Sequence, residues 1–167
     1  MHVELEVSQV AVDPFVNSPV LVLQELGGGR KLVVRIGQME AVALVSVLEK
    51  IPLTRPTAHD FALAAVRAFS GEIVRVDFDP GVDRNPAAIV VVRGSGASCK
   101  SEVALPARVV DAVAIALRSG APIRADESLL EDGSPLTMGL FPSTADWPTA
   151  AADLETISDD EFPKYKM

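Results

Sequence analysis

Cysteine and histidine are scarce in this sequence. The 167 residues include one cysteine, Cys99, and two histidines, His2 and His59. A single cysteine excludes a disulfide within the chain and argues against a zinc site built on several cysteines. Cys99 falls in a predicted strand with only a lysine nearby, so we interpret it as a free structural thiol. Catalysis by histidine would depend on His59, the only histidine in the body of the chain.

Long hydrophobic runs are also absent. No uncharged apolar segment approaches the roughly 20 residues that a membrane helix needs. The start, MHVELEVSQV, lacks the basic and apolar regions of a signal peptide. Hydrophobic residues nevertheless make up 49% of the chain and mean hydropathy is +0.28, which excludes disorder throughout. We expect a soluble cytoplasmic protein of one domain that does not associate with membranes.

An excess of basic charge is missing as well, because the net charge is −8. The imbalance lies in the C-terminal quarter: residues 1–124 hold 13 basic and 13 acidic residues, whereas residues 125–167 hold 10 acids and two lysines. We expect a domain over residues 1–139 and an acidic, partly helical or flexible tail over 140–167. That tail is either solvated or bound to a protein partner. The neutral body lacks the broad basic surface of a duplex-DNA binder, so nucleic-acid affinity would be local and salt-sensitive.

Periodicity predicts a mixture of strands and helices. The predicted strands are 2–7, 10–12, 18–26, 30–36, 72–78, 87–94, 99–105 and 121–123. The segment 10–12 is out of phase with 2–7, which suggests a bulge or a second short strand. Helices are predicted over 38–51, from Thr57 to a stop at Gly71, and from Pro106 to Gly120. This order is typical of an α+β fold, a single compact domain with a mixed β-sheet and about three main helices.

The predicted helix that begins at Thr57 has two notable features. Its start, TAHD, resembles a capping box, in which Thr57 and Asp60 would satisfy each other's backbone N–H groups. An apolar stripe recurs every four residues at Phe61, Ala65 and Phe69, and we expect this stripe to face the core. His59 would then point away from the core-facing side.

No local motif carries a complete catalytic site. The glycine runs 27–29 and 94–96 lack the context of phosphate-binding loops, and we interpret both as turns. Glu40 follows a predicted strand end, and Arg108 and Asp111 are spaced to pair across one helical turn. The sequence has no closely spaced set of metal ligands. A metal site would need the tertiary fold to bring together Glu40, Asp60 and Asp111.

Three stretches taken together resemble the bifunctional nuclease domain family. VVRIGQMEAVALVSVLEK (33–50) matches an Ile-Gly-x-x-Glu-Ala signature, and PLTRPTAHDF (52–61) matches an Arg-Pro-x-x-His-Asp segment. ARVVDAVAIALRSGAPI (107–123) matches an Arg-x-x-Asp-Ala segment with Ala-Pro-Ile after it. The order and spacing hold across about residues 3–162, so the set is more specific than any one motif.

The resemblance implies a compact α+β domain that cleaves RNA and DNA with little sequence selectivity. Carried over to matching positions, it implies a site made of Glu40, His59, Asp60, Arg108 and Asp111. In this hypothesis Glu40, Asp60 and Asp111 hold Mg²⁺ or Mn²⁺, Arg108 offsets developing charge, and His59 protonates the leaving oxygen. The expected partners are single-stranded RNA or DNA and further copies of the chain, with a dimer as the expected assembly.

Two departures from the family pattern leave alternatives open. Val109 and Val110 stand where the family usually has Pro-Ser, and Thr57–Ala58 replaces Leu-Thr before the histidine. The polar residues could equally fix the junction between three helices, since buried charges must be paired. The alternative function is a non-catalytic protein-binding or regulatory module on the same fold. A small-molecule sensor is a third hypothesis.

Overall fold

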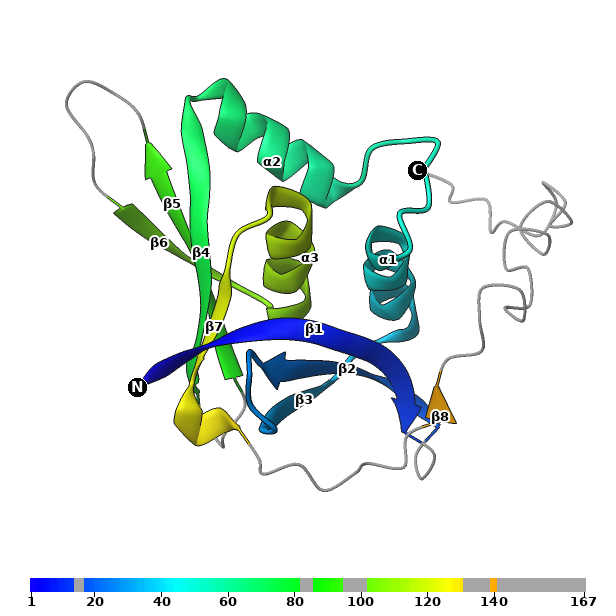
Figure 1. Ribbon diagram of the computed structural model, residues 1–167. Helices are drawn as coiled ribbons and strands as arrows, with labels where there is room; N and C mark the ends of the chain where they lie inside the picture. Colours follow the sequence, from blue (N-terminus) through cyan, green and yellow to red (C-terminus); the bar gives the residue numbers. More distant parts are fainter. Residues whose placement is uncertain (14–16, 82–85, 95–101, 131–138, 141–167) are drawn as a thin grey trace, which may run out of the picture.

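The computed structural model describes residues 1–13, 17–81, 86–94, 102–130 and 139–140 (Figure 1). The strands are β1 (His2–Asp13), β2 (Ser18–Glu25), β3 (Lys31–Arg35), β4 (Gly71–Pro80), β5 (Pro86–Gly94), β6 (Glu102–Ala107), β7 (Ile123–Asp126) and β8 (Gly139–Leu140). The helices are α1 (Gln38–Leu48), α2 (Ala58–Ala68) and α3 (Val109–Ser119), and a 3-10 turn, η2, covers Glu127–Leu129. The α+β class and the three main helices are confirmed.

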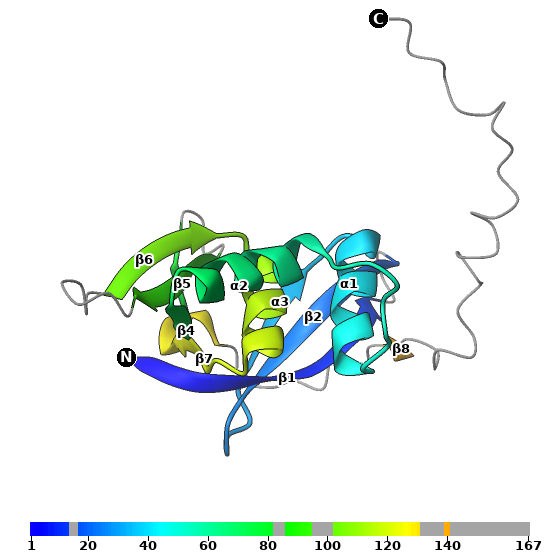
Figure 2. The same ribbon diagram turned by 90° about the horizontal axis from the view of Figure 1, so that it is seen from above.

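The strands form one mixed sheet in the order β3-β2-β1-β7-β4-β5-β6, with β8 paired to β1. Only the β4–β7 pair is parallel among the described strands, and the other pairs are antiparallel. The sheet curves around α3, and the three helices lie on one side of it (Figures 1 and 2). Helix α1 packs on β1 and β2, whereas α2 and α3 pack on the β4 side. This arrangement brings the three helices side by side.

Strand β1 shows why the sequence alternation changes phase. Its pairing with β2 shifts register between Val7 and Gln9, which is a β-bulge or a similar irregularity. The extra residue lets Val10 continue on the buried side after Leu5. The predicted irregularity before residues 10–12 is therefore confirmed. The predicted hairpin of β2 and β3 is also confirmed, and Gly27 takes a positive φ of 74° in its turn.

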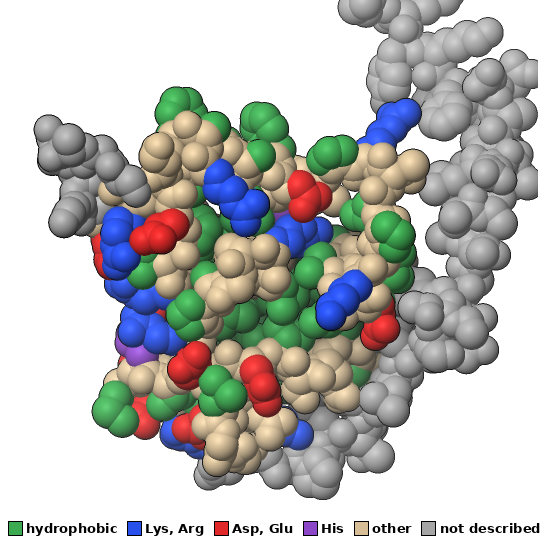
Figure 3. All heavy atoms as spheres, turned by 45° about the horizontal axis from the view of Figure 1, so that its top comes forward, with side chains coloured by type: hydrophobic (Ala, Val, Ile, Leu, Met, Phe, Trp, Pro, Cys, Tyr) green, Lys and Arg blue, Asp and Glu red, His purple; other side chains and the backbone are tan. Residues whose placement is uncertain are grey.

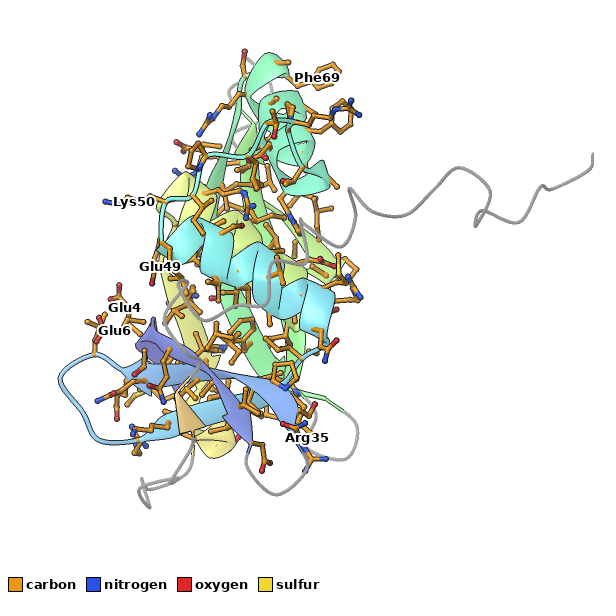
Figure 4. The ribbon with its side chains drawn as sticks, turned by 90° about the vertical axis from the view of Figure 1, so that its right-hand side faces the viewer. Glu4, Glu6, Arg35, Glu49, Lys50 and Phe69 are labelled. Carbon is orange, nitrogen blue, oxygen red and sulfur yellow. The ribbon has the colours of Figure 1, made fainter. Side chains whose placement is uncertain are left out.

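Helix α2 packs with a different face from the one its aromatic residues suggested. Phe69, labelled in Figure 4, is 86% exposed. Phe61 is 74% exposed, whereas Leu63 is buried. The prediction that the Phe61/Ala65/Phe69 stripe faces the core is wrong. The packed side carries the buried Leu63 and the half-buried Val66, and the aromatic stripe is left on the outside. His59 shares the inward face with Leu63, because residues four apart lie one above the other on a helix.

Two predicted helix boundaries are also corrected. Helix α2 ends at Ala68, Ser70 takes the left-handed φ of 56°, and Gly71 is already the first residue of β4. A side chain at Gly71 would bring its Cβ to 3.0 Å from the carbonyl oxygen of Val66, so close packing explains this glycine. Pro106 lies in β6, at the edge of the sheet, where a missing N–H is tolerated. The predicted stop at Gly120 is confirmed by its left-handed conformation.

Some predictions fall on residues that the structure does not describe. Cys99 and the start of its predicted strand lie outside the described residues, as does nearly all of the predicted tail, 141–167. Within the described ranges, no helix combines the length and the apolar character needed to cross a membrane.

Candidate functional site

The first turn of α1 supplies Glu40. The N-cap of this helix is Gly37, which has no side chain to accept a hydrogen bond from the helix. The Glu40 side chain instead reaches back to the start of the helix: its Oε2 accepts a hydrogen bond of 2.8 Å from the Gly37 N–H. This contact fixes the carboxylate and leaves Oε1 directed toward a neighbouring helix.

The first turn of α2 supplies His59 and Asp60. Thr57 and Asp60 form the predicted capping box: the Thr57 N–H donates to Asp60 Oδ2 at 2.7 Å, and the Asp60 N–H donates to Thr57 Oγ1 at 3.3 Å. His59 points inward, and its side chain is 19% exposed. Its Nε2 lies 3.1 Å from Asp111 Oδ1. The other ring nitrogen, Nδ1, has no hydrogen-bond partner among the described residues. It is not buried, so it is accessible to solvent.

The start of α3 supplies Arg108 and Asp111. Arg108 is the N-cap residue, and its guanidinium binds two carboxylates from two helices. Nε donates to Asp111 Oδ2 at 2.7 Å, Nη2 donates to Asp111 Oδ1 at 3.2 Å, and Nη1 donates to Glu40 Oε1 at 3.0 Å. The Arg108 side chain is 70% exposed, so it forms the solvent-facing side of this arrangement.

Four of the five predicted site residues thus meet through hydrogen bonds. We call Glu40, His59, Arg108 and Asp111 the helix-start cluster, because each comes from the N-cap or first turn of a helix. Asp60 is adjacent to His59 in sequence, but its carboxylate binds elsewhere. Its Oδ1 accepts from Arg118 Nε at 3.1 Å, near the other end of α3.

Hydrogen bonds and ion pairs in the site keep its carboxylates and arginine charged. Hydrogen bonding to Arg108, with a further contribution from His59, lowers the pKa of Asp111. The same interaction raises the pKa of Arg108, and the negative charge of Glu40 adds to the effect. Hydrogen bonds from Thr57, together with the charge of Arg118, lower the pKa of Asp60. The two aspartates are therefore ionised and Arg108 is cationic at neutral pH.

The predicted metal ligands are not arranged around a common point. In the part of the chain that the structure describes, no three His, Cys, Asp or Glu side chains form a group that could hold a metal ion. The guanidinium of Arg108 lies between Glu40 and Asp111, where a cation shared by these carboxylates would lie. Asp60 is turned toward Arg118 instead. In this arrangement the residues do not fit a divalent ion.

A groove next to Asp60 was missed by sequence reasoning. Its volume is about 440 Å³, and it lies between the end of α1, the loop that follows, the first turn of α2 and α3. The charged residues that line it are Lys50, Arg55, Asp60 and Arg118. One sequence feature could have pointed to this groove. Arg55 and Pro56 stand directly before the helix that carries His59, within the stretch that resembles the family motif. Elsewhere, Figure 3 shows acidic and basic side chains interspersed with hydrophobic ones on the visible face.

Comparison with known proteins agrees with the motifs. A family model described as the bifunctional nuclease domain matches residues 21–137, a segment that includes all five predicted site residues. The chain is also similar to the uncharacterized proteins MT1877, from Mycobacterium tuberculosis strain CDC 1551/Oshkosh, and Rv1829, from strain ATCC 25618/H37Rv. Each is 31% identical over 166 residues, which cover 98% of this chain and 90% of the relative.

Proposed function

Because this chain belongs to the bifunctional nuclease domain family, we propose that it hydrolyses phosphodiester bonds of RNA and DNA, with low sequence selectivity, at the helix-start cluster. The observation that carries this proposal is the His59–Asp111 hydrogen bond beside the exposed guanidinium of Arg108. A histidine oriented by a carboxylate can transfer protons, and an adjacent arginine can stabilise charge on a phosphate. Single-stranded RNA and DNA are the expected substrates.

Asp111 determines which nitrogen of His59 is available for chemistry. An ionised carboxylate only accepts hydrogen bonds, so Nε2 of His59 donates to Asp111. In the neutral ring, Nδ1 then carries a free lone pair and can take a proton from the attacking water. The water oxygen bonds to phosphorus, and the bond from phosphorus to the leaving oxygen breaks. The proton on Nδ1 passes to that oxygen, which restores the neutral ring.

Arg108 is suited to stabilise the negative charge that builds up on phosphorus oxygens. A guanidinium has five N–H groups, and three of them are used in the bonds to Asp111 and Glu40. The remaining two are free for a phosphate, which approaches from solvent. Glu40 and Asp111 hold the guanidinium in place, so little reorganisation is needed during the reaction.

A divalent ion would supply activation of water and stabilisation of phosphate charge if it were bound. The described residues do not fit such an ion in their present arrangement. The proton transfer and the charge stabilisation are therefore assigned to His59 and Arg108, and the role of Mg²⁺ or Mn²⁺ is left to experiment.

A second candidate function is a non-catalytic protein-binding or regulatory module. The observation that favours it is a set of exposed apolar side chains, Phe61 and Phe69 on α2 and Val103 and Leu105 on β6. We propose that these side chains support self-association. The expected assembly is a dimer, and light scattering would measure its mass.

The cytoplasmic location stays a prediction.

The deciding experiment is cleavage of labelled single-stranded RNA and DNA, with Mn²⁺, with Mg²⁺ and with a chelator. Wild type, His59→Ala and Arg108→Ala are purified in parallel to detect a contaminating nuclease. We expect each variant to lose about 10²-fold or more in rate, because each removes a group that acts in the transition state.

Arg93→Ala is the matched control. Arg93 also binds two carboxylates, Glu72 and Glu102, but it lies on β5, away from the three helix starts. It should keep wild-type activity. Equal activity in all four proteins, or none in any of them, would rule out the proposed nuclease and favour the binding module.

A further inference from the structure

The groove beside Asp60 adjoins the proposed site at the first turn of α2. Asp60 lines the groove, and the preceding residue, His59, belongs to the helix-start cluster. The groove lies toward the ends of α1 and α3, whereas the cluster lies at their starts, so a strand that reaches both would cross the first turn of α2. The groove has a volume of about 440 Å³, within the range of ligand sites, and it is open to solvent, so a longer strand could extend out of it.

The groove is locally basic in a chain with a net charge of −8. It is lined by three cations, Lys50, Arg55 and Arg118, and by a single carboxylate, Asp60. Arg118 is 9% exposed, and its charge is compensated by Asp60. Among the residues that the structure describes, Lys50 and Arg55 have no carboxylate partner, so their charges are available to a ligand. Figure 4 shows the Lys50 side chain extending outward beyond the end of α1.

The position of Lys50 is fixed by the backbone around it. Its φ is 53°, a left-handed conformation that reverses the chain after α1. The Lys50 N–H donates to the Val47 carbonyl, and the Ile51 N–H donates to the Ser46 carbonyl. The ammonium group therefore extends from a defined turn.

Apart from Ser46, the rest of the lining is apolar, and it contains no aromatic ring. Val47, Ile51, Leu53 and Pro56 line the groove together with the charged residues. Ile51 is 43% exposed and Leu53 is 51% exposed, so both can contact a ligand. Aliphatic side chains can cover the faces of bases without reading their hydrogen-bonding edges. Single-stranded nucleic acid, with a charged backbone and apolar base faces, matches this combination.

We propose that this groove binds the sugar–phosphate backbone of a single strand, with Lys50 and Arg55 contacting phosphates next to the one that reaches His59. The inference rests on the proposed function, because it assigns the groove to the substrate of the same site. It also explains low sequence selectivity, since neither cation nor aliphatic wall distinguishes one base from another.

The test is binding of a fluorescent 12-nucleotide phosphorothioate DNA strand, which keeps its charges and resists cleavage. Affinity is measured by anisotropy between 50 and 200 mM salt for the full chain and for Lys50→Ala/Arg55→Ala. We expect weaker binding at every salt concentration. The slope of log affinity against log salt should decrease in size by about 1.4, because each lost contact to a single strand contributes about 0.7.

Lys31→Ala/Arg67→Ala is the control with the same change in net charge. Both residues lie outside the groove lining, and this variant should bind like wild type. Lys50→Arg/Arg55→Lys keeps both charges and should retain most of the affinity, while melting temperatures check that every variant is folded. Equal binding by the groove variant and the control would overturn the proposal. Tighter binding by the groove variant would also overturn it, and would indicate that an acidic segment such as 141–167 occupies the groove.

The cleavage assay separates this inference from the proposed function. Binding that depends on Lys50 and Arg55, without any cleavage, would leave the groove as a strand-binding site and reject the nuclease. Cleavage by wild type with unchanged binding in the groove variant would keep the nuclease and reject the groove.

Discussion

Arg108 takes the place that a metal ion was expected to hold. Its guanidinium binds both Glu40 and Asp111, and His59 lies against the same aspartate. Arg108 therefore links the carboxylates of two helices, whereas His59 binds Asp111 directly. Because 70% of its side chain is exposed, replacing Arg108 should leave the core intact.

Removing Arg108 should create an affinity for a divalent ion. In Arg108→Ala, the two carboxylates lose their shared cation, and His59 adds a nitrogen ligand of the kind that Mn²⁺ accepts. We expect Mn²⁺ to raise the melting temperature of this variant by several degrees more than that of wild type. Arg93→Ala leaves Glu72 without its cation and Glu102 bound to Arg75 alone, with no histidine in these contacts, and it should respond like wild type. An equal Mn²⁺ effect in wild type and Arg108→Ala would mean that metal and guanidinium do not compete.

At the scale of single elements, the start of α2 combines a structural and a functional role. Thr57 and Asp60 close the helix end with a full capping box, and His59 stands between them on the inward face. The cap therefore positions the proposed proton-transfer group. It also links the helix to pH, because its hydrogen bonds lower the pKa of Asp60.

Thr57→Ala should destabilise the protein by about 1 kcal/mol at pH 7, the usual effect of losing a threonine cap. Asp60 has a folded-state pKa below its ordinary value of 3.8, so the stabilisation it provides is present above that pH. It is lost as the pH falls from 3.8 through the folded-state pKa. Urea unfolding at pH 7 and at pH 3 should show a smaller effect of the variant at the lower pH. Thr54→Ala, in the exposed loop before the helix, serves as the control and should change stability little at either pH.

The elements were largely predictable because their signals are local. The alternation in β1, the glycine turn after β2 and the capping box of α2 each depend on residues a few positions apart. The orientation of α2 was not predictable in the same way. Its aromatic stripe satisfies helical periodicity, but the face that packs is set by how closely α3 and β4 approach. Leu63 packs on the inward face, whereas Phe61 and Phe69 stay exposed.

At the scale of the whole molecule, long-range pairing assembles the site. The parallel contact of β4 with β7 and the antiparallel contact of β1 with β7 join the two halves of the sheet. They place the start of α3 beside the start of α1, so that Glu40 meets Arg108 across 68 positions in sequence. The motifs identified the residues of the cluster. Their hydrogen-bond partners depend on the fold, and so the Arg118 pairing of Asp60 and the groove beside it were missed.

The charge of the whole molecule limits how it can bind nucleic acid. A net charge of −8 repels a polyanion at long range, so binding must depend on the few cations near the site. Counting Lys50, Arg55 and Arg108 as phosphate contacts gives an expected salt slope of about −2 for a single strand. The dissociation constant should then rise roughly 20-fold between 50 and 200 mM salt.

Duplex DNA of the same length should bind more weakly than the single strand at each salt concentration. A duplex cannot bring its base faces against the aliphatic wall of the groove, and residues 1–124, with 13 basic and 13 acidic residues, have no excess of basic charge as compensation. Anisotropy titrations of both probes, with matched sequence and label, make the comparison. A slope beyond about −5 for either probe would require more phosphate contacts than these three cations provide. In that case the binding surface would have to extend well past the groove and the helix-start cluster.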